Sequence, residues 1–572
     1  MTDMKSSGKK SVRFGGHLAD VIEENKCGIP ENYMLIVQQI EDPLIKSSHL
    51  SEMLKQFIDI VNILDQDQKK LVHRMLSIRW VNREKEVIEL FQKFLLELVA
   101  ANSVHQLQVL NCLITHFIPA SCLSNLTSCE TCVPQEEIFH IIHGTLKKIF
   151  TLIPLTTNIV LPLLVSHYPF IKKDKEALDW YIKNLLFLTT YRVNLRPQIL
   201  ELIISKSLKL DTHCPRESIK KSMTSEEHDL FEMETDNSMK KEGFVDKLDI
   251  VMETLLQFIH DICYSNGELS LQADTLLKEL VSIFDKVILP IHDSSHIQFL
   301  IFYICSFEKS FSETFLNHLW RKVQDPSAPM ILRQTSLSYI ASFLARAKYL
   351  HLNCVLTILN AMTVWIHCYI KEREGLYDYI GPLHETVRHG AFYSACQAVF
   401  YIIIFRHKQI LDLPKGFEIM RKFNLEHIIM SRLNPLKFCI STVVGMFSSL
   451  MRQHQLVYCD TIIERNNRMT LPVCGQSKNS ASVNPLDCFF PFDPYLLKSS
   501  SHMIEEIYQE WEGRVPELKD ESRDEDHHID NELMSASPIS IPSIFSQDKH
   551  FIDSISGKSM SPGFSLLNKS SF

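Results

Sequence analysis

Apolar residues recur at three- and four-residue spacing along most of this 572-residue chain. In one early stretch the recurring positions are Met53, Leu54, Phe57, Ile58, Val61 and Leu64. This spacing places apolar side chains on one face of an α-helix, and similar segments follow from about Tyr33 to Tyr508. Glycine supplies only 16 residues, and this scarcity favours helices over a turn-rich β architecture. The sequence therefore predicts an all-α fold with strand content near zero.

The chain is mildly acidic, with a formal net charge of −9 and an isoelectric point near 6.3. An autonomous DNA-binding domain normally carries a strongly basic surface that neutralises phosphates. Strong direct binding of DNA is therefore not expected, and protein partners suit this composition better.

No segment is apolar enough to predict a membrane span. The longest uninterrupted apolar run, residues 398–405, is far shorter than the ~18 residues that a span needs. The N-terminus lacks the apolar core of a signal peptide. The 15 cysteines are scattered, and their odd number does not suit a closed disulfide framework. These features predict a soluble intracellular protein without membrane association.

The pattern divides the chain into five parts. Residues 1–32 are predicted to be a flexible segment, and residues 33–211 to be N-terminal helical repeats. A polar stretch at 212–244 has few aliphatic residues and is predicted to be a disordered loop. Helical repeats are expected again over 245–508. Residues 509–572 are acidic and then serine-rich, which predicts a disordered tail.

One group of residues has the chemistry of a metal site. Cys129 and Cys132 form a C-x-x-C pair, with Cys122 before them and His140 and His143 after them. Thiolates and imidazoles at short spacing can hold tetrahedral zinc. However, both histidines lie in an apparent amphipathic helix that its apolar positions already explain. We favour a loop with incidental cysteines, and predict no metal and no cofactor.

Sequence motifs of enzymes are absent. His384 and Glu385 begin like a zincin helix, but the next histidine is His389, five residues on from His384. Five residues rotate a helix by about 500°, so the two imidazoles do not share a face. Phosphate-binding and nucleophile-elbow patterns are also missing. The sequence predicts a protein without catalytic activity.

Two Asx-Pro dipeptides late in the chain carry helix-start signals. Asn434-Pro435 and Asp493-Pro494 each place a side-chain acceptor directly before a proline. This is the arrangement of an N-cap followed by proline in the first turn. We therefore expect a helix to begin at each of them, followed by a buried apolar run.

Between these dipeptides lies the polar string ERNNR. Glu464 and Arg468 are one helical turn apart and are expected to pair on an exposed face. Arg465, Asn466 and Asn467 lie between them. A polar cluster between two apolar segments is most often a solvated turn, and no catalytic geometry is implied.

Several ordered strings resemble one known family. The longest region, residues 433–499, contains LNPLKFCISTVVGMFSSL, LVYCDTIIERNNR and NPLDCFFPFDPYLL. Upstream lie SYIASFLARAKYL at 338–350 and FYSACQAVFYIIIFRHKQ at 392–409, and KSVRFGG at 10–16 looks like an N-terminal signature. Together these strings resemble the RNA polymerase I-specific transcription initiation factor family.

The resemblance implies a HEAT-repeat-like α-solenoid that acts as a non-enzymatic initiation factor. It implies binding to RNA polymerase I and bridging of the enzyme to promoter-bound initiation factors, for ribosomal RNA gene transcription in the nucleus and nucleolus. By the same resemblance, Arg465, Asn466, Asn467 and Arg468 form a partner-binding surface. The alternative is a helical-repeat scaffold of another class, such as a nuclear transport adaptor.

Regulatory segments depart from the vertebrate pattern of that family. The proline-directed serine expected before RFGG is missing, because Ser6 and Ser7 are followed by Gly8. The expected acidic loop is replaced by ASCLSNLTSCETC. An alternative interpretation is therefore that the chain is a divergent paralogue with altered regulation. In the tail, Ser537 and Ser561 each precede a proline and are the predicted phosphorylation sites.

Overall fold

The computed structural model describes residues 17–42, 45–119, 134–169, 174–214, 216, 236–265, 267–292, 294–373, 375, 382–469, 486 and 489–511. The candidate zinc ligands Cys122, Cys129 and Cys132 lie outside these residues, as do the predicted phosphorylation sites Ser537 and Ser561. The KSVRFGG string and residues 512–572 also lie outside them.

The chain divides into two compact units. The first consists of Met1–Pro215, Ser225–Phe307 and Leu497–Ile504, and the second of Arg216–Thr224, Glu308–Leu496 and Glu505–Phe572. The last part of the chain therefore contributes to both units. The division differs from the one expected from the polar loop, because the first unit continues beyond residue 244 to Phe307.

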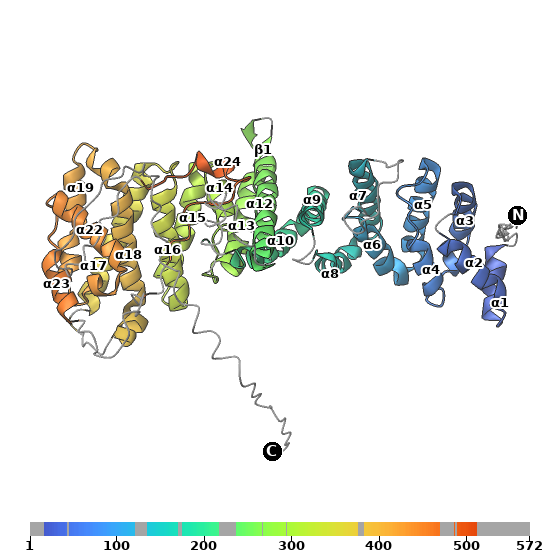
Figure 1. Ribbon diagram of the computed structural model, residues 1–572, viewed down its shortest axis with the longest axis horizontal. Helices are drawn as coiled ribbons and strands as arrows, with labels where there is room; N and C mark the ends of the chain where they lie inside the picture. Colours follow the sequence, from blue (N-terminus) through green and yellow to red (C-terminus); the bar gives the residue numbers. More distant parts are fainter. Residues whose placement is uncertain are drawn as a thin grey trace, which may run out of the picture. The chain divides into compact units, whose positions relative to one another are not determined.

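Helices make up almost all of the regular structure described in the first unit (Figure 1). In chain order they are α1 (Leu18–Lys26), α2 (Glu31–Glu41), α3 (Ser47–Asp59), α4 (Lys69–Leu76), α5 (Lys85–Ala101), α6 (Gln106–Thr115), α7 (Gln135–Leu152), α8 (Thr157–His167), α9 (Lys175–Tyr191), α10 (Arg196–Thr212), α12 (Asp236–Cys263), α13 (Gln272–Ile283) and α14 (Phe299–Ile304). One hairpin joins β1 (Tyr264–Ser265) to β2 (Glu268–Leu269), with Gly267 at a φ of 83° in its turn.

These helices pack in two rows. One row runs through α3, α5, α7, α9 and α12, and the other through α2, α4, α6, α8, α10 and α13. From α2 to α12, each helix packs against the helix two places along the chain, so neighbouring repeats bury one another's apolar faces. Five apolar side chains at three- and four-residue spacing along α5 are fully buried: Val87, Phe91, Phe94, Leu95 and Leu98.

Short 3₁₀ turns connect the rows, and polar side chains link one turn to the next. The Asn102 side chain donates to the carbonyl oxygens of Val61 and Leu64, at 3.0 and 2.7 Å. Further along, the Arg192 guanidinium donates to the carbonyl of Phe150 at 2.7 Å. The Arg192 bond reaches a carbonyl in the last turn of α7, where helix carbonyls lack partners within the helix.

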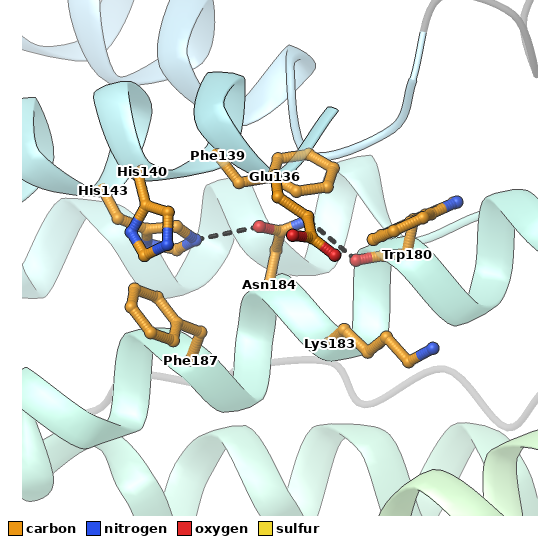
Figure 2. A pocket seen from close by; sticks show the side chains of 8 residues that line it. All are labelled: Glu136, Phe139, His140, His143, Trp180, Lys183, Asn184 and Phe187. Carbon is orange, nitrogen blue, oxygen red and sulfur yellow. Dashed lines mark hydrogen bonds between the residues drawn. The ribbon is translucent and has the colours of Figure 1, made fainter. Parts of the chain in front are cut away.

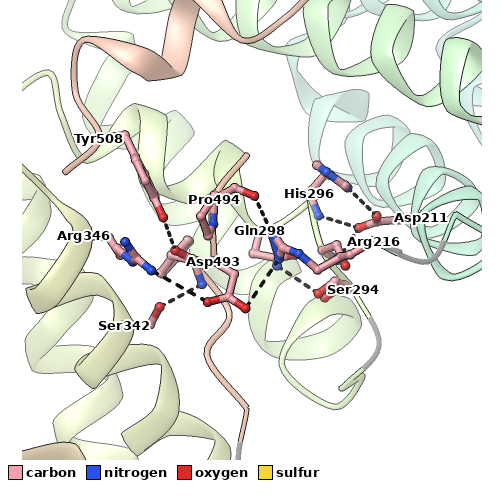
Figure 3. Close-up of polar contacts among 12 residues, drawn as sticks. Asp211, Arg216, Ser294, His296, Gln298, Ser342, Arg346, Asp493, Pro494 and Tyr508 are labelled. Carbon is pink, nitrogen blue, oxygen red and sulfur yellow. Dashed lines mark hydrogen bonds and ion pairs between the residues drawn. The ribbon is translucent and has the colours of Figure 1, made fainter. Parts of the chain in front are cut away.

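A buried carboxylate connects distant parts of the first unit. Asp211, at the end of α10, accepts backbone N–H bonds from Ser295, His296 and Ile297 at 2.9, 2.8 and 3.1 Å. The His296 Nδ1 lies 3.0 Å from the other carboxylate oxygen (Figure 3). Burial alone raises the pKa of Asp211, but the hydrogen bonds from His296 and Ile297 outweigh it and hold that pKa below its usual value.

Nine helices belong to the described part of the second unit alone. They are α15 (Lys309–Gln324), α16 (Met330–Arg346), α17 (Leu352–Arg373), α18 (Pro382–Leu411), α19 (Gly416–Lys422), α20 (Leu425–Met430), α21 (Pro435–Phe438), α22 (Ser441–Gln453) and α23 (Asp460–Met469). A further helix, α24 (His502–Glu505), lies in the last described segment.

The centre of the second unit is α18, which packs against α16, α17, α19, α21 and α22. Every residue from 389 to 406 is buried, as expected for a helix that is apolar nearly all round. At its end, Arg406 donates to the carbonyl oxygens of Leu344 and Ala347 at 2.8 and 2.6 Å. Burial lowers the pKa of Arg406 to about 10. Arg406 therefore caps the C-terminus of α16 and does not simply complement the dipole of its own helix.

The last described segment crosses α16 and α18 of the second unit. Phe492 N–H donates to Ser342 Oγ at 2.9 Å, and Gln509 N–H donates to the Arg346 carbonyl at 2.7 Å. The buried Arg346 guanidinium lies 4.0 Å from the Asp493 carboxylate and 5.4 Å from the Tyr508 ring centroid (Figure 3). Because these contacts surround one buried cation, Arg346 anchors both ends of the segment.

Three expectations from the sequence are wrong. No helix begins at Asp493-Pro494, because the Asp493 carboxylate contacts Arg346 and Arg216 instead of capping a first turn. The helical body begins with α1, inside the segment expected to be flexible, and Val21 and Ile22 are buried there. Finally, α12 begins at Asp236, inside the stretch predicted to be a loop.

By length and composition, α17 is apolar enough to cross a membrane. Taken together, α7 and the Pro154–His167 segment also meet this test, although the two are bent by 118° relative to each other. However, α17 packs against α18 and α20 in the second unit. Core helices of soluble proteins share this composition, so the finding is weak evidence for a span.

Replacing Arg346 with methionine should lower the free energy of unfolding of the second unit by about 3 kcal/mol. The substitution leaves Asp493 without its buried cation and removes contacts to Tyr508 and Phe405. Urea denaturation followed by circular dichroism measures the change. The control is Arg452→Met, which removes an exposed pair with Asp460 and should cost no more than about 1 kcal/mol. Equal losses in the two variants would contradict the anchoring role.

Asp211→Asn should lower the free energy of unfolding at pH 7 by about 3 kcal/mol, since a charged acceptor of several buried bonds is lost. The folded pKa of Asp211 lies below its unfolded value of about 3.9. Its stabilising contribution is therefore complete above that unfolded value and is lost as pH falls through the folded pKa. Denaturation curves give the difference in free energy of unfolding between the wild type and the variant, and this difference should be larger at pH 7 than at pH 3. A constant difference would count against this account.

Candidate functional site

The polar string ERNNR forms part of α23, which packs against α21 in the second unit. It is thus helical and not a solvated turn. Glu464 and Arg468 pair at 3.3 Å on the exposed face, as the spacing predicted. Exposed ion pairs of this kind stabilise a helix only weakly, which leaves both side chains available to a partner.

The four residues predicted as a partner-binding surface do not share one face. Arg465, Asn467 and Arg468 are exposed, whereas Asn466 is buried, one turn after the buried Ile462. The Asn466 side chain exchanges two hydrogen bonds with that of Asn434, at 2.7 and 3.2 Å. Asn466 therefore positions α23, and only its three neighbours can contact a partner directly.

Asn434 precedes α21, whose first residue is the predicted Pro435. The expected side-chain cap is absent, because the Asn434 amide faces Asn466. Its backbone has a φ of 47°, a left-handed conformation that asparagine tolerates better than most residues. The same asparagine thus turns the chain and holds α23 against α21.

A pocket of about 180 Å³ lies between α7 and α9 in the first unit (Figure 2). It is lined by Glu136, Phe139, His140 and His143 of α7 and by Trp180, Lys183, Asn184 and Phe187 of α9. The ring centroids of Phe139 and Trp180 are 5.2 Å apart, and those of His143 and Tyr191 are 5.8 Å apart, so the two helices run in the same direction. Phe187 is 40% exposed.

The buried His143 lies within the pocket wall with both ring nitrogens bonded. Asn184 donates its amide hydrogens to the carbonyls of Phe117 and Trp180, so its oxygen accepts from His143 Nε2 at 2.9 Å. Tyr191 O–H then donates to His143 Nδ1 at 2.9 Å. Burial lowers the pKa of His143 to about 4, against the opposing effect of the Asn184 bond. The imidazole is therefore neutral at pH 7 and packs as part of the wall.

The structure lends no support to a zinc site at His140 and His143. Both nitrogens of His143 are bonded to protein groups, and its pocket is mainly aromatic. Among the residues that are described, no three histidine, cysteine or acidic side chains gather as metal ligands. The cysteines of that candidate site lie outside the described ranges.

The zincin-like stretch is a packing network within α18. Glu385 and His389 share a helix face, 3.8 Å apart. Tyr369 O–H lies 2.8 Å from His389 Nδ1, and Tyr393 O–H donates to Glu385 at 3.2 Å. Glu385 and His389 are both buried, at 1% and 3% exposed. These contacts join α17 to α18.

Sequence reasoning missed the pocket between α7 and α9. Its aromatic residues follow helical spacing, with Trp180 and Phe187 seven residues apart on α9. Such spacing also predicts ordinary core positions, and Phe187 differs only in being exposed. Only the packing of α7 against α9 shows that these residues line a pocket and are not ordinary core positions.

Comparison with known proteins identifies the family. The family model described as RNA polymerase I specific transcription initiation factor RRN3 matches residues 13–243 and 215–515. These two matches cover most of the chain and both units.

Named relatives agree with this match. The mouse protein "RNA polymerase I-specific transcription initiation factor RRN3" is 38% identical over 551 residues, covering 90% of this chain and 84% of the relative. The Schizosaccharomyces pombe protein of the same description is 25% identical over 524 residues, covering 84% and 82%.

A solved structure supports the fold. The chain is similar to the "Crystal Structure of RNA Polymerase I Transcription Initiation Factor Rrn3" with a TM-score of 0.70 and 22% identity, covering 86% of this chain and 97% of that one. The prediction of an all-α, HEAT-repeat-like fold is confirmed. The chain therefore belongs to the RNA polymerase I-specific transcription initiation factor RRN3 family, whose members are initiation factors and not enzymes.

Proposed function

We propose that this protein binds RNA polymerase I and bridges it to promoter-bound initiation factors at ribosomal RNA genes. The observation that carries the proposal is 38% identity over 551 residues to a relative named as a polymerase I-specific initiation factor. The alternative of a nuclear transport adaptor does not agree with the family model that matches residues 13–243 and 215–515. The proposed role is in the nucleus, at the nucleolus.

The surfaces described above suit an adaptor. Helical repeats offer long exposed faces on which many separate contacts add up to specific binding. On α23, Arg465, Asn467 and Arg468 present polar groups whose placement depends on the buried Asn466. An acidic or polar surface of the polymerase is the expected counterpart.

Phosphorylation remains part of the proposal. Ser537 and Ser561, outside the described residues, each precede a proline. A phosphate adds about −1.5 to −2 charges and would change the electrostatic fit of a nearby contact surface. Because residues 524–532 are already acidic, modification would strengthen repulsion from acidic partners.

The double variant Arg465→Glu and Arg468→Glu should weaken binding to purified RNA polymerase I about tenfold, which corresponds to ~1.4 kcal/mol. The free energy of unfolding should change by only about 0.5 kcal/mol, because both side chains are exposed. Biolayer interferometry gives the dissociation constant, and thermal denaturation gives the stability.

The control is the double variant Arg421→Glu and Lys422→Glu on α19, which reverses the charge of two other exposed residues of the second unit and changes the net charge by the same amount. If both double variants lose equal affinity, the effect is one of net charge and α23 is not a specific contact. If the wild-type protein does not bind the polymerase at all, the proposed function itself is wrong.

Asn466→Ala should behave differently from the arginine variants. It removes both hydrogen bonds to Asn434 and should lower the free energy of unfolding by about 1–2 kcal/mol. Thermal denaturation of Asn466→Ala beside Arg465→Ala, an exposed neighbour, provides the comparison. Similar melting of the two variants would show that the amide pair does not hold α23 in place.

A further inference from the structure

Glycine is an unfavourable residue in the middle of a helix, yet Gly144 lies near the centre of α7. A glycine there costs roughly 1 kcal/mol relative to alanine. Its φ is not positive, and a Cβ built on it would meet no atom within 4 Å. Gly144 is also exposed. Neither the backbone nor any described neighbour therefore requires glycine at this position.

Gly144 lies one helical turn after His140, a residue in the wall of the pocket between α7 and α9. His140, one turn before Gly144, lines the pocket together with Phe139 and Phe187 (Figure 2). The pocket is mainly aromatic and opens to solvent, and Phe187 remains 40% exposed although its ring lies against those of His140, His143 and Tyr191. An apolar pocket of this kind suits one large side chain of a partner, the usual anchor of a protein interface.

Opposite charges lie along α7 on either side of Gly144. Glu136 and Glu137 are in the first turn, and Lys147 and Lys148 follow Gly144 by one turn. From Glu136 to Lys148 the helix rises about 18 Å, or roughly three turns. None of these four side chains pairs with another residue in the described part of the chain. A ligand with an acidic end and an opposite basic end would match this pattern.

We propose that the groove between α7 and α9 binds an amphipathic helix of RNA polymerase I. One large apolar side chain of that helix enters the pocket, its backbone passes close to Gly144, and its acidic end lies beside Lys147 and Lys148. Two helices running side by side form a groove suited to a third helix, and a missing side chain permits close backbone approach. The identity of the partner rests on the proposed function.

The test is Gly144→Gln, measured for binding to purified RNA polymerase I and for thermal unfolding. The glutamine side chain would fill the space left for the partner, so the dissociation constant should rise about tenfold or more. The unfolding midpoint should be no lower than in the wild type, since glutamine favours a helix more than glycine does. A variant that is equally or more stable but binds more weakly is the expected signature.

The matched control is Gly243→Gln in α12. Gly243 also lies within a helix of the first unit, and a Cβ there would also meet nothing within 4 Å. This variant should bind the polymerase as the wild type does. A second variant, Phe187→Ala, removes one wall of the pocket and should also weaken binding about tenfold.

The outcomes separate the two proposals. If the wild type fails to bind the polymerase, the proposed function falls. If the wild type and Gly144→Gln bind equally well, the groove proposal is overturned while the proposed function stands. If Gly144→Gln melts at a lower temperature than the wild type, glycine is required by the fold and the groove proposal is likewise overturned.

Discussion

From α2 to α12, each helix of the first unit buries its apolar face by packing against the helix two places further along the chain. A single amphipathic helix pair has too little neighbouring surface to do this alone, so every repeat depends on the next. The same packing places α7 and α9 side by side and parallel, which creates the groove between them. It also aligns the short turns, where Asn102 bonds to a carbonyl of the preceding turn and Arg192 to a carbonyl at the end of α7.

Buried polar groups then connect segments that are far apart in sequence. Asp211 binds the backbone at 295–297, and Asp249 accepts bonds from Ser499 and Ser500 at 2.7 and 2.9 Å. In the second unit Arg346 performs the corresponding role for the last described segment. A buried charge without partners costs several kcal/mol, so each of these groups requires its distant segment to be in place. They make each unit cooperative beyond its local helix contacts.

The proposed contact surfaces use side chains that this framework does not need. On α23, Asn466 holds the helix in place and leaves Arg465, Asn467 and Arg468 exposed. On α7, both ring nitrogens of His143 are bonded within the pocket wall. Gly144 lowers the helix propensity of α7, and no described neighbour requires a glycine there. Features that reduce stability without serving the fold are typical of binding sites. An adaptor can thus carry its specificity on exposed helix faces while its interior remains ordinary.

The amino-acid sequence by itself determined the helical class, the apolar face of α5 and the Glu464–Arg468 pair. All of these depend on residues within a few turns of one another, where spacing decides which side chains share a face. Only the tertiary structure decided the partners of Asp493 and Asn434. Asp493 contacts Arg346 instead of starting a helix, and Asn434 bonds to Asn466 instead of capping α21. It also assigned Arg406 to the end of α16, and it formed an open pocket between α7 and α9. Local signals specify what a side chain can do, but the packing of helices decides which distant partner it meets.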